Sequence, residues 1–308
     1  MTYVSLIIIN YNSEDFTLKC LQSIVKKSSL VNEIEIIIVD NASNYKEFLK
    51  LKKNIKTNFA NLSLRIIRNK INMGFGSGNM IGFEKAKGKY VVFLNNDTVL
   101  LNDCISILFT FMELNTKVAL CGPQAFDLHQ KLIPSFDHFI SPFKLIYGRF
   151  ILEIINSKKF PKRKRIYLKP LKVNYVEGSF MFFRAENFIS VNGFDKNIFL
   201  YYEENDICLR LHKKGYHTFL IPEAKYVHHR GGSTKRSIKI KTELKISLFY
   251  IIKKHFSFFT LIVIWIYFVL RYLIRIIVKP SYWYLFKTIL FFAPLSKSLK
   301  NEQIKVKR

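Results

Sequence analysis

The sequence is poor in acidic residues and in cysteine, and it has no secretory signal peptide. Its 22 Asp and Glu face 49 Lys and Arg, and the resulting net charge of +27 indicates an anionic partner such as lipid, nucleic acid or a phosphorylated substrate. The four cysteines form neither a CxxC pair nor a zinc-binding spacing, so we expect buried free thiols. The first apolar run is short and lacks a basic start, which leads us to expect a cytoplasmic location.

A complete dinucleotide-binding fingerprint is also missing, although one stretch approaches it. Gly74-Phe75-Gly76 begins GxG, but Asn79 occupies the position of the third glycine. That fingerprint belongs in the turn after the first strand, where this sequence has YNSED. The pattern therefore argues against an oxidoreductase. The glycines indicate close approach of the backbone to a ligand, followed by a helix from about residue 79 to residue 86.

The sequence does contain a series of short apolar runs that each end in polar residues. Four such runs are Val4–Ile9 before Asn10, Tyr11 and Asn12; Ile34–Val39 before Asp40 and Asn41; Leu62–Ile67 before Arg68 and Asn69; and Tyr90–Leu94 before Asn95, Asn96 and Asp97. Helical patterns separate the runs, which predicts a doubly wound, mostly parallel α/β sheet. Because parallel strands end at one edge, we expect these polar residues to share a crevice.

The turn at Asn95, Asn96 and Asp97 is the most informative of these strand ends. A carboxylate at this position suits Mg²⁺ or Mn²⁺ carrying a phosphate, because both ions prefer hard oxygen ligands. Taken alone, the turn is more typical of a solvated strand end. The tandem pair His228-His229 follows a predicted last strand, residues 216–221, and precedes Gly231-Gly232. That arrangement favours either a metal or phosphate contact or a structural role.

An acidic cluster opens a predicted helix in the second half of the chain. Glu203, Glu204 and Asp206 stand at its start, where the helix dipole favours negative charge. An ordinary acidic first turn explains them equally well. Adjacent carboxylates repel one another, however, which raises the pKa of one of them and suits it to act as a general base. A preceding run, Val173–Phe183, predicts a strand with Gly178 at a bulge or close approach, and residues 129–172 predict a long insertion that covers the site.

The C-terminal part changes character, and we divide the chain into residues 1–235 and 236–308. Phe256–Leu270 carries no charge but is shorter than a bilayer span. A longer helix would carry Lys253, Arg271, Arg275 and Lys279 on one stripe. This pattern predicts a helix lying in the membrane interface, with a single tilted span as the alternative. We therefore expect a peripheral or monotopic protein at the cytoplasmic face of the membrane, in contact with anionic lipid.

Six motifs together resemble one enzyme family. They are VSLIIINYNSED, IIIVDNAS, NMGFGSGN, VVFLNNDT, NGFDKNIFLYYEENDICLR and HHRGGS. In this order they resemble the nucleotide-sugar-dependent inverting glycosyltransferases of family 2, which have the GT-A fold. The likeness is greatest to the bacterial branch that includes rhamnosyltransferases of surface polysaccharides. It covers about residues 2 to 235 and ends before the apolar C-terminal part.

The resemblance implies a role for each matching residue. Asn10, Tyr11 and Asn12 would line the nucleotide pocket; Asp40 and Asn41 would bind the base; Asn72, Gly74, Phe75 and Asn79 would shape the donor site; and Asn95, Asn96 and Asp97 would form the family's DxD element in an Asn-first form. Asp97 would hold the metal, and His228 would contact the metal or the diphosphate. Glu204 stands where the family usually has the Asp that acts as general base, so Glu203 and Asp206 remain alternatives for that role.

These roles imply an inverting transfer of rhamnose or another hexose from a nucleotide-sugar to a lipid-linked or polysaccharide acceptor, with Mg²⁺ or Mn²⁺ as cofactor. The alternative is a catalytically degenerate GT-A-like protein that binds anionic membranes. Nucleic acid is not an expected partner, because the sequence contains no aromatic and basic recognition module.

Overall fold

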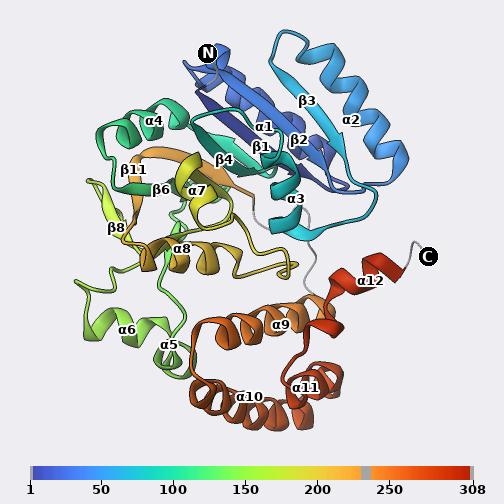
Figure 1. The fold of residues 1–308 in the computed structure, drawn as a ribbon, viewed down its shortest axis with the longest axis vertical. Coiled ribbons are helices and arrows are strands. Elements are labelled where there is room, and N and C mark those ends of the chain that lie inside the picture. Colours follow the sequence, from blue (N-terminus) through green and yellow to red (C-terminus); the bar gives the residue numbers. More distant parts are fainter. Residues whose placement is uncertain (1–2, 230–236, 306–308) are drawn as a thin grey trace.

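The computed structural model describes residues 3–229 and 237–305, and its centre is a mixed nine-stranded sheet with helices on both faces (Figure 1). Eight strands follow the order β3-β2-β1-β4-β10-β6-β11-β5, and β8 pairs with β11. The expected division of the chain at residue 235 lies outside the described residues, as does the glycine pair after His229.

The first half of the sheet is parallel, as the apolar runs predict. Its strands are β1 (Val4–Asn10), β2 (Ile34–Asp40), β3 (Leu64–Arg68) and β4 (Tyr90–Asn95), and its helices are α1 (Glu14–Lys27), α2 (Tyr45–Asn58) and α3 (Gly74–Phe83), with a 3-10 turn at Val31–Glu33. Asn10 pairs with Asp40, and Ile9 pairs with Asn95, so the predicted polar strand ends do meet at one edge. The predicted start of α3 at residue 79 was wrong, because the helix begins at Gly74.

The second half of the sheet mixes strand directions. It contains β5 (Thr98–Leu100), α4 (Cys104–Leu114), β6 (Val118–Phe126), β8 (Leu171–Val173), β10 (Phe180–Arg184), α7 (Ala185–Ser190), α8 (Glu203–Lys213) and β11 (His217–His228). β10 is antiparallel to both β4 and β6. The strand predicted over Val173–Phe183 is in fact three, because β9 (Tyr175–Val176) leaves the large sheet to pair with β7 (Phe136–Asp137). β11 is also longer than predicted and reaches His228.

The insertion before β8 and the C-terminal part lie together at the far end of the molecule from β1–β3 (Figure 1). The insertion forms α5 (Pro142–Tyr147) and α6 (Arg149–Ile155). The C-terminal part forms α9 (Ile238–His255), α10 (Phe258–Val278), α11 (Trp283–Leu290) and α12 (Leu299–Lys305), with 3-10 turns at Pro280–Tyr282 and Leu295–Lys297. Within the described residues, α10 is the one helix long and apolar enough to cross a membrane, and 22% of its apolar window is buried.

The predicted continuous stripe of cations on one C-terminal helix was wrong. The chain leaves α9 at Phe256, and Ser257 caps a new helix by accepting a hydrogen bond from the Thr260 amide at 3.3 Å. Lys253 therefore lies on α9, whereas Arg271 lies on α10. The break arises because a serine hydroxyl competes well for a backbone amide at a helix start.

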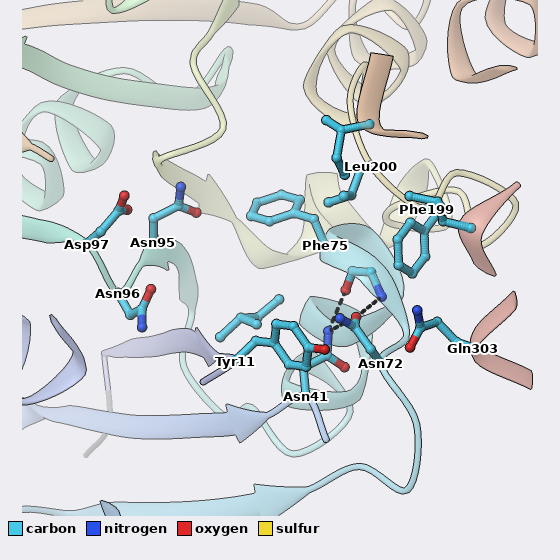
Figure 2. A pocket seen from close by; sticks show the side chains of 14 residues that line it. Tyr11, Asn41, Asn72, Phe75, Asn95, Asn96, Asp97, Phe199, Leu200 and Gln303 are labelled. Carbon is cyan, nitrogen blue, oxygen red and sulfur yellow. Dashed lines mark hydrogen bonds between the residues drawn. The ribbon is translucent and has the colours of Figure 1, made fainter. Parts of the chain in front are cut away.

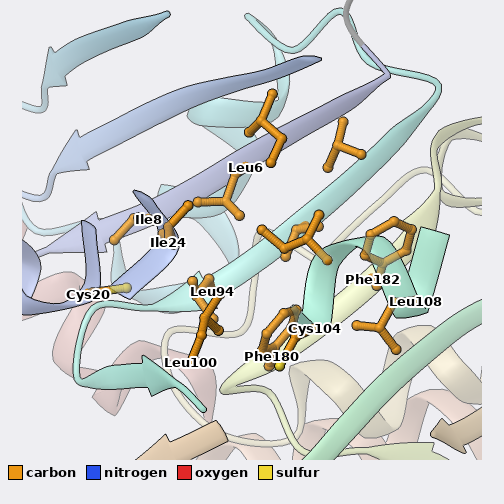
Figure 3. Close-up of a cluster of buried hydrophobic side chains, with 14 of the residues drawn as sticks. Leu6, Ile8, Cys20, Ile24, Leu94, Leu100, Cys104, Leu108, Phe180 and Phe182 are labelled. Carbon is orange, nitrogen blue, oxygen red and sulfur yellow. The ribbon is translucent and has the colours of Figure 1, made fainter. Parts of the chain in front are cut away.

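Apolar side chains form one cluster on each face of the sheet and a third among the C-terminal helices. The first lies under α1, α2 and α4, and its members include Leu6, Ile8, Cys20, Ile24, Leu94, Leu100, Cys104, Leu108, Phe180 and Phe182 (Figure 3). The third joins α9, α10 and α11 to Ile140 and Ile198 of the preceding chain. All four cysteines are buried and free, which confirms the expectation of reduced thiols.

Candidate active site

A pocket of about 390 Å³ lies at the carboxyl ends of β1, β2 and β4 (Figure 2). This volume suits a small ligand. The pocket is lined by Tyr11, Asn41, Asn72, Gly74, Phe75, Asn95, Asn96, Asp97, Phe199 and Leu200, with Ile9, Ile240, Leu299 and Gln303. Eight of the residues predicted from the strand ends and the glycine-rich stretch therefore share one pocket.

The side chain of Asn41 holds the loop that forms one pocket wall. Its amide nitrogen donates to Asn72 Oδ1 at 2.9 Å and to the Gly74 carbonyl at 3.0 Å. Its oxygen accepts from Asn69 Nδ2 and from the Met73 amide, each at 3.0 Å. These four bonds use the full hydrogen-bonding capacity of the amide. Asn41 thus shapes the wall, and the base contact expected of it would require one of these bonds to break.

Gly74 allows a second wall to approach. Its φ of +78° lies in the left-handed region, and a Cβ at this position would lie 2.1 Å from the Phe199 carbonyl oxygen. That same oxygen accepts a hydrogen bond from the Phe75 amide at 2.9 Å. Only glycine fits this contact, as the sequence led us to expect.

Four residues expected at the donor site lie outside the pocket lining. Asn10 and Asp40 are fully buried, and Asn10 Nδ2 donates to Asp40 Oδ2 at 2.9 Å. Asp40 Oδ1 also accepts a hydrogen bond from the Ser43 amide at 3.2 Å and lies 3.5 Å from Arg68 Nε. The Asn12 oxygen accepts from the Asn44 amide, and Asn79 is buried within α3. Asn10, Asn12 and Asp40 instead fix the ends of β1 and β2 that carry Tyr11 and Asn41.

The three side chains of the turn after β4 have two roles: Asn96 anchors the turn, and Asn95 and Asp97 lie at the pocket. The Asn96 amide donates to Ser13 Oγ at 2.7 Å and to Thr17 Oγ1 at 2.9 Å, which ties the turn to the start of α1. Asn95 and Asp97 remain at the pocket side (Figure 2). Anchoring by Asn96 therefore positions the two flanking side chains.

Asp97 and His228 face each other across two paired strands. Thr98 pairs with His228 where β5 meets β11, and Asp97 Oδ1 lies 3.3 Å from His228 Nε2. Asp97 is 4% exposed, and its Oδ1 accepts no hydrogen bond from the part of the chain that the structure describes. A buried carboxylate oxygen without a donor, facing an imidazole nitrogen, fits a divalent cation. No group of three or more His, Cys, Asp or Glu surrounds a metal position within residues 3–229 and 237–305.

Glu203 and Glu204 follow two tyrosines with left-handed backbone. Tyr201 has φ 74° and Tyr202 has φ 70°, values that are uncommon outside glycine and that set the direction in which α8 begins. Glu203 is 2% exposed, and burial, followed by the charge of Glu204, raises its pKa well above the ordinary value. Both causes favour the protonated form of Glu203 over the charged form.

Glu204 lies beside the pocket wall. A Cβ on Gly178 would lie 3.8 Å from Glu204 Oε2 and 3.8 Å from Phe75 Cζ, so this carboxylate and the pocket-lining ring flank the same glycine, although Glu204 itself is not among the residues that line the pocket. Burial, followed by the charge of Glu177, raises the pKa of Glu204 to about 7. Such a group is partly ionised at neutral pH, as a general base requires.

Asp206 lies away from the pocket, in a cluster of ion pairs. Its carboxylate contacts Arg210 Nη2 at 2.6 Å, His255 Nε2 at 2.7 Å and Lys254 Nζ at 2.8 Å. These partners hold its pKa well below the ordinary value although burial opposes that shift. Asp206 thus joins α8 to α9, and this placement does not suit the acid–base role that the sequence left open for it.

Several residues of the site were not predicted. Glu177 stands in a turn between β9 and β10, a position resembling that of the predicted strand-end acids, and this could have drawn attention to it. Ile240, Leu299 and Gln303 line the pocket from the C-terminal part, where no local sequence pattern indicated them. The pocket is therefore completed by the part of the chain expected to serve membranes alone.

Comparison with known proteins places this chain among sugar transferases. Residues 5–190 match Glycosyl transferase family 2. The chain is 30% identical over 267 residues to Rhamnosyltransferase WbbL of Escherichia coli strain K12, covering 82% of this chain and 93% of that protein. It is 25% identical over 243 residues to dTDP-rhamnosyl transferase RfbF of Shigella flexneri, covering 76% of this chain and 70% of that protein.

Solved structures agree in fold. GalNAc-T7, determined with UDP, GalNAc and Mn²⁺, has a TM-score of 0.56 at 16% identity, and the match covers 80% of this chain but 48% of that one. The mannosyltransferase PcManGT from Pyrobaculum calidifontis, determined with GDP-Man and Mn²⁺, has a TM-score of 0.55 at 14% identity, with coverage of 80% and 61%. The fold is therefore GT-A-like. The chain belongs to glycosyl transferase family 2 and is a glycosyltransferase of the rhamnosyltransferase-like kind.

Proposed function

We propose that this enzyme transfers rhamnose, with inversion, from a nucleotide-sugar to a lipid-linked or polysaccharide acceptor in the synthesis of a cell-surface glycan. The observation that carries the proposal is the arrangement around Phe75. Glu204, with a pKa of about 7, flanks Gly178 together with this ring, and Phe75, Asp97 and Asn95 line the same pocket. Similarity to two bacterial rhamnosyltransferases supports the choice of sugar.

The reaction requires one proton acceptor and one direction of attack. Glu204 takes the proton of an acceptor hydroxyl while that oxygen bonds to the anomeric carbon. The bond from this carbon to the diphosphate oxygen breaks on the opposite face, which inverts the configuration. Burial and the neighbouring charge of Glu204 favour the protonated form of Glu203, which reduces charge repulsion within the pair.

Asp97 and His228 would hold a divalent cation, either Mg²⁺ or Mn²⁺. Two protein ligands leave the other coordination positions to diphosphate oxygens and water, as expected for a metal that carries a phosphorylated substrate. When bound, the cation offsets negative charge that develops on the leaving diphosphate. The Mn²⁺ in both structural neighbours supports this assignment.

A transfer assay over a set of nucleotide-sugars tests the proposed donor. We expect dTDP-rhamnose with Mg²⁺ or Mn²⁺ to give the highest rate on a lipid-linked acceptor, and NMR of the product to show the inverted anomer. Retention of configuration would contradict the mechanism. Absence of both transfer and metal-dependent release of nucleoside diphosphate, with every common donor, would support the degenerate membrane-binding alternative.

We further propose that the protein lies at the cytoplasmic face of the membrane, and the C-terminal helices support attachment to a membrane surface. Leu261, Ile264 and Phe268 bury one face of α10 against the protein. Apolar side chains also remain exposed on this helix, among them Leu270, Ile274, Ile277 and Val278. A helix packed against the protein on one side and apolar on the other suits a position in the membrane plane. The net charge of +27 favours anionic lipid as the surface.

A further inference from the structure

A second cavity, of about 420 Å³, lies between the insertion and the C-terminal helices. α5, α9 and α10 contribute to its wall, and Tyr202, at the start of α8, closes one side. Five cations and three aromatic rings line it: Lys144, Arg149, Arg163, Lys245 and Arg271, with Tyr202, Phe268 and Tyr272. No carboxylate is among its described lining residues. We call it the basic cavity.

Three of the five cations share one buried carboxylate behind the wall. Asp137 lies 2.7 Å from Arg149 Nη2, 3.1 Å from Lys144 Nζ and 3.6 Å from Arg163 Nε. Glu153 provides a further partner for Arg163, at 2.8 Å. Positive charge therefore exceeds negative charge even on the side of the basic cavity where counter-ions are present.

The other two cations have no carboxylate partner among the described residues. Lys245 Nζ lies 3.9 Å from the centre of the Phe268 ring, and Arg271 Nη1 donates to the Tyr267 hydroxyl at 2.6 Å. Burial, with a smaller contribution from the nearby charge of Arg271, lowers the pKa of Lys245 to about 7. An anion bound beside Lys245 and Arg271 would favour the charged form of Lys245 and would supply the negative partner that both residues lack among the described residues.

The basic cavity lies between the transfer site and the apolar surface of α10. Tyr202 lines the cavity and immediately precedes Glu203-Glu204 in the chain. Arg271 lines it from α10, where the neighbouring Leu270 and Ile274 are exposed. An amphiphile with its charged head in the cavity could therefore extend its chain along α10 and its sugar toward Glu204.

We propose that the basic cavity binds the phosphate or diphosphate head of the lipid-linked acceptor, with Lys245 and Arg271 as its principal contacts. This inference rests on the proposed function for the identity of the amphiphile. Guanidinium and ammonium groups suit phosphate oxygens, and the aromatic wall suits the first apolar carbons of the chain. The basic cavity is separate from the pocket at the carboxyl ends of β1, β2 and β4, which we call the donor pocket, because the two have no lining residue in common.

Binding of geranyl diphosphate to the full chain in EDTA, measured by calorimetry, tests this site without any transfer reaction. We expect Lys245→Met and Arg271→Gln each to weaken binding about tenfold or more. Lys253→Met removes an exposed cation from the same helix as Lys245 and is expected to bind as the unmodified protein does. Inorganic diphosphate represents only the charged head of this ligand, and geraniol represents only its apolar chain. Both are expected to bind more weakly than geranyl diphosphate.

Two outcomes would overturn the inference. If both Lys245→Met and Arg271→Gln keep the affinity and the thermal unfolding of the unmodified protein, geranyl diphosphate does not bind in the basic cavity. Binding of inorganic diphosphate as tight as that of geranyl diphosphate would assign the cavity to a soluble phosphate and not to a lipid. If geranyl diphosphate binds as expected but no sugar is transferred, the proposed function fails while this site stands.

Discussion

Asp97 Oδ1 lies 3.3 Å from His228 Nε2, although the two residues are far apart in the sequence. The contact exists because β11 continues to His228 and pairs there with β5, directly after the turn that Asn96 anchors to α1. It joins a carboxylate and an imidazole at the edge of the donor pocket.

This pair predicts a metal-dependent loss of nucleotide affinity on mutation. In Mn²⁺, Asp97→Ala and His228→Ala should each weaken binding of the donor's nucleoside diphosphate about tenfold or more, because each removes one metal ligand. In EDTA both variants should bind the nucleoside diphosphate with the same affinity as the unmodified protein does. Calorimetry with and without Mn²⁺ measures both. His229→Ala is the matched control. The His229 ring packs on Phe16, and its backbone amide, which alanine keeps, donates to the Asp97 carbonyl. An equal loss in EDTA would argue against the metal.

The pKa of Glu204 predicts the pH dependence of transfer. The base acts in its ionised form, and its pKa is raised to about 7, so kcat should rise with pH up to about 7 and level off above it. Below that value the rate should fall about tenfold per pH unit. Initial rates at saturating substrates measure the profile. A flat profile between about pH 5.5 and about pH 8.5 would contradict the assignment.

Gly74 and Gly148 form a matched pair for testing the pocket wall. Both have positive φ, but a Cβ on Gly74 would collide with the Phe199 carbonyl, whereas a Cβ on Gly148 would meet nothing within 4 Å. We expect Gly148→Ala to lower the free energy of unfolding by about 1 kcal/mol without affecting nucleotide affinity. Gly74→Ala should lower both. Chemical denaturation and nucleotide titration separate these effects, and equal behaviour of the two variants would contradict the close approach at Phe199.

The exposed apolar face of α10 predicts how the protein attaches to membranes. Ile274 is 67% exposed and Ile277 is 79% exposed, so replacing both with Glu should leave folding and nucleotide affinity intact. Sedimentation with vesicles containing anionic lipid should fall strongly, because two charges would enter the interface. Leu168→Glu, at a position that is 85% exposed on the insertion, serves as control. Unchanged sedimentation of the double variant would rule out this face as the attachment site.

The strands and the polar crevice were predictable because they depend on local patterns. Buried parallel strands require continuous apolar runs, and their carboxyl ends necessarily share an edge, so Tyr11, Asn41 and Asp97 could be placed together from sequence. The roles of Asn10 and Asn96 were not predictable. Whether an amide faces a ligand or a neighbouring loop depends on partners such as Asp40 and Ser13, which local spacing does not reveal.

The contribution of the C-terminal part could not be predicted for a related reason. Asp206 belongs to the same acidic cluster as Glu204, and its contacts with Arg210, Lys254 and His255 distinguish the two carboxylates. Two of these partners, Lys254 and His255, lie on α9, far from Asp206 in the sequence. Packing between distant segments thus decides which carboxylate of the cluster is held in ion pairs.

Replacement of Glu204 by Gln tests the central assignment most directly. The amide keeps the size of the side chain but cannot accept the proton, so kcat should fall by about 10²- to 10⁴-fold while nucleotide affinity stays unchanged. Glu203→Gln, at a carboxyl whose protonated form burial favours, should reduce kcat far less. Near-normal kcat in Glu204→Gln, or a larger loss in Glu203→Gln, would contradict the account.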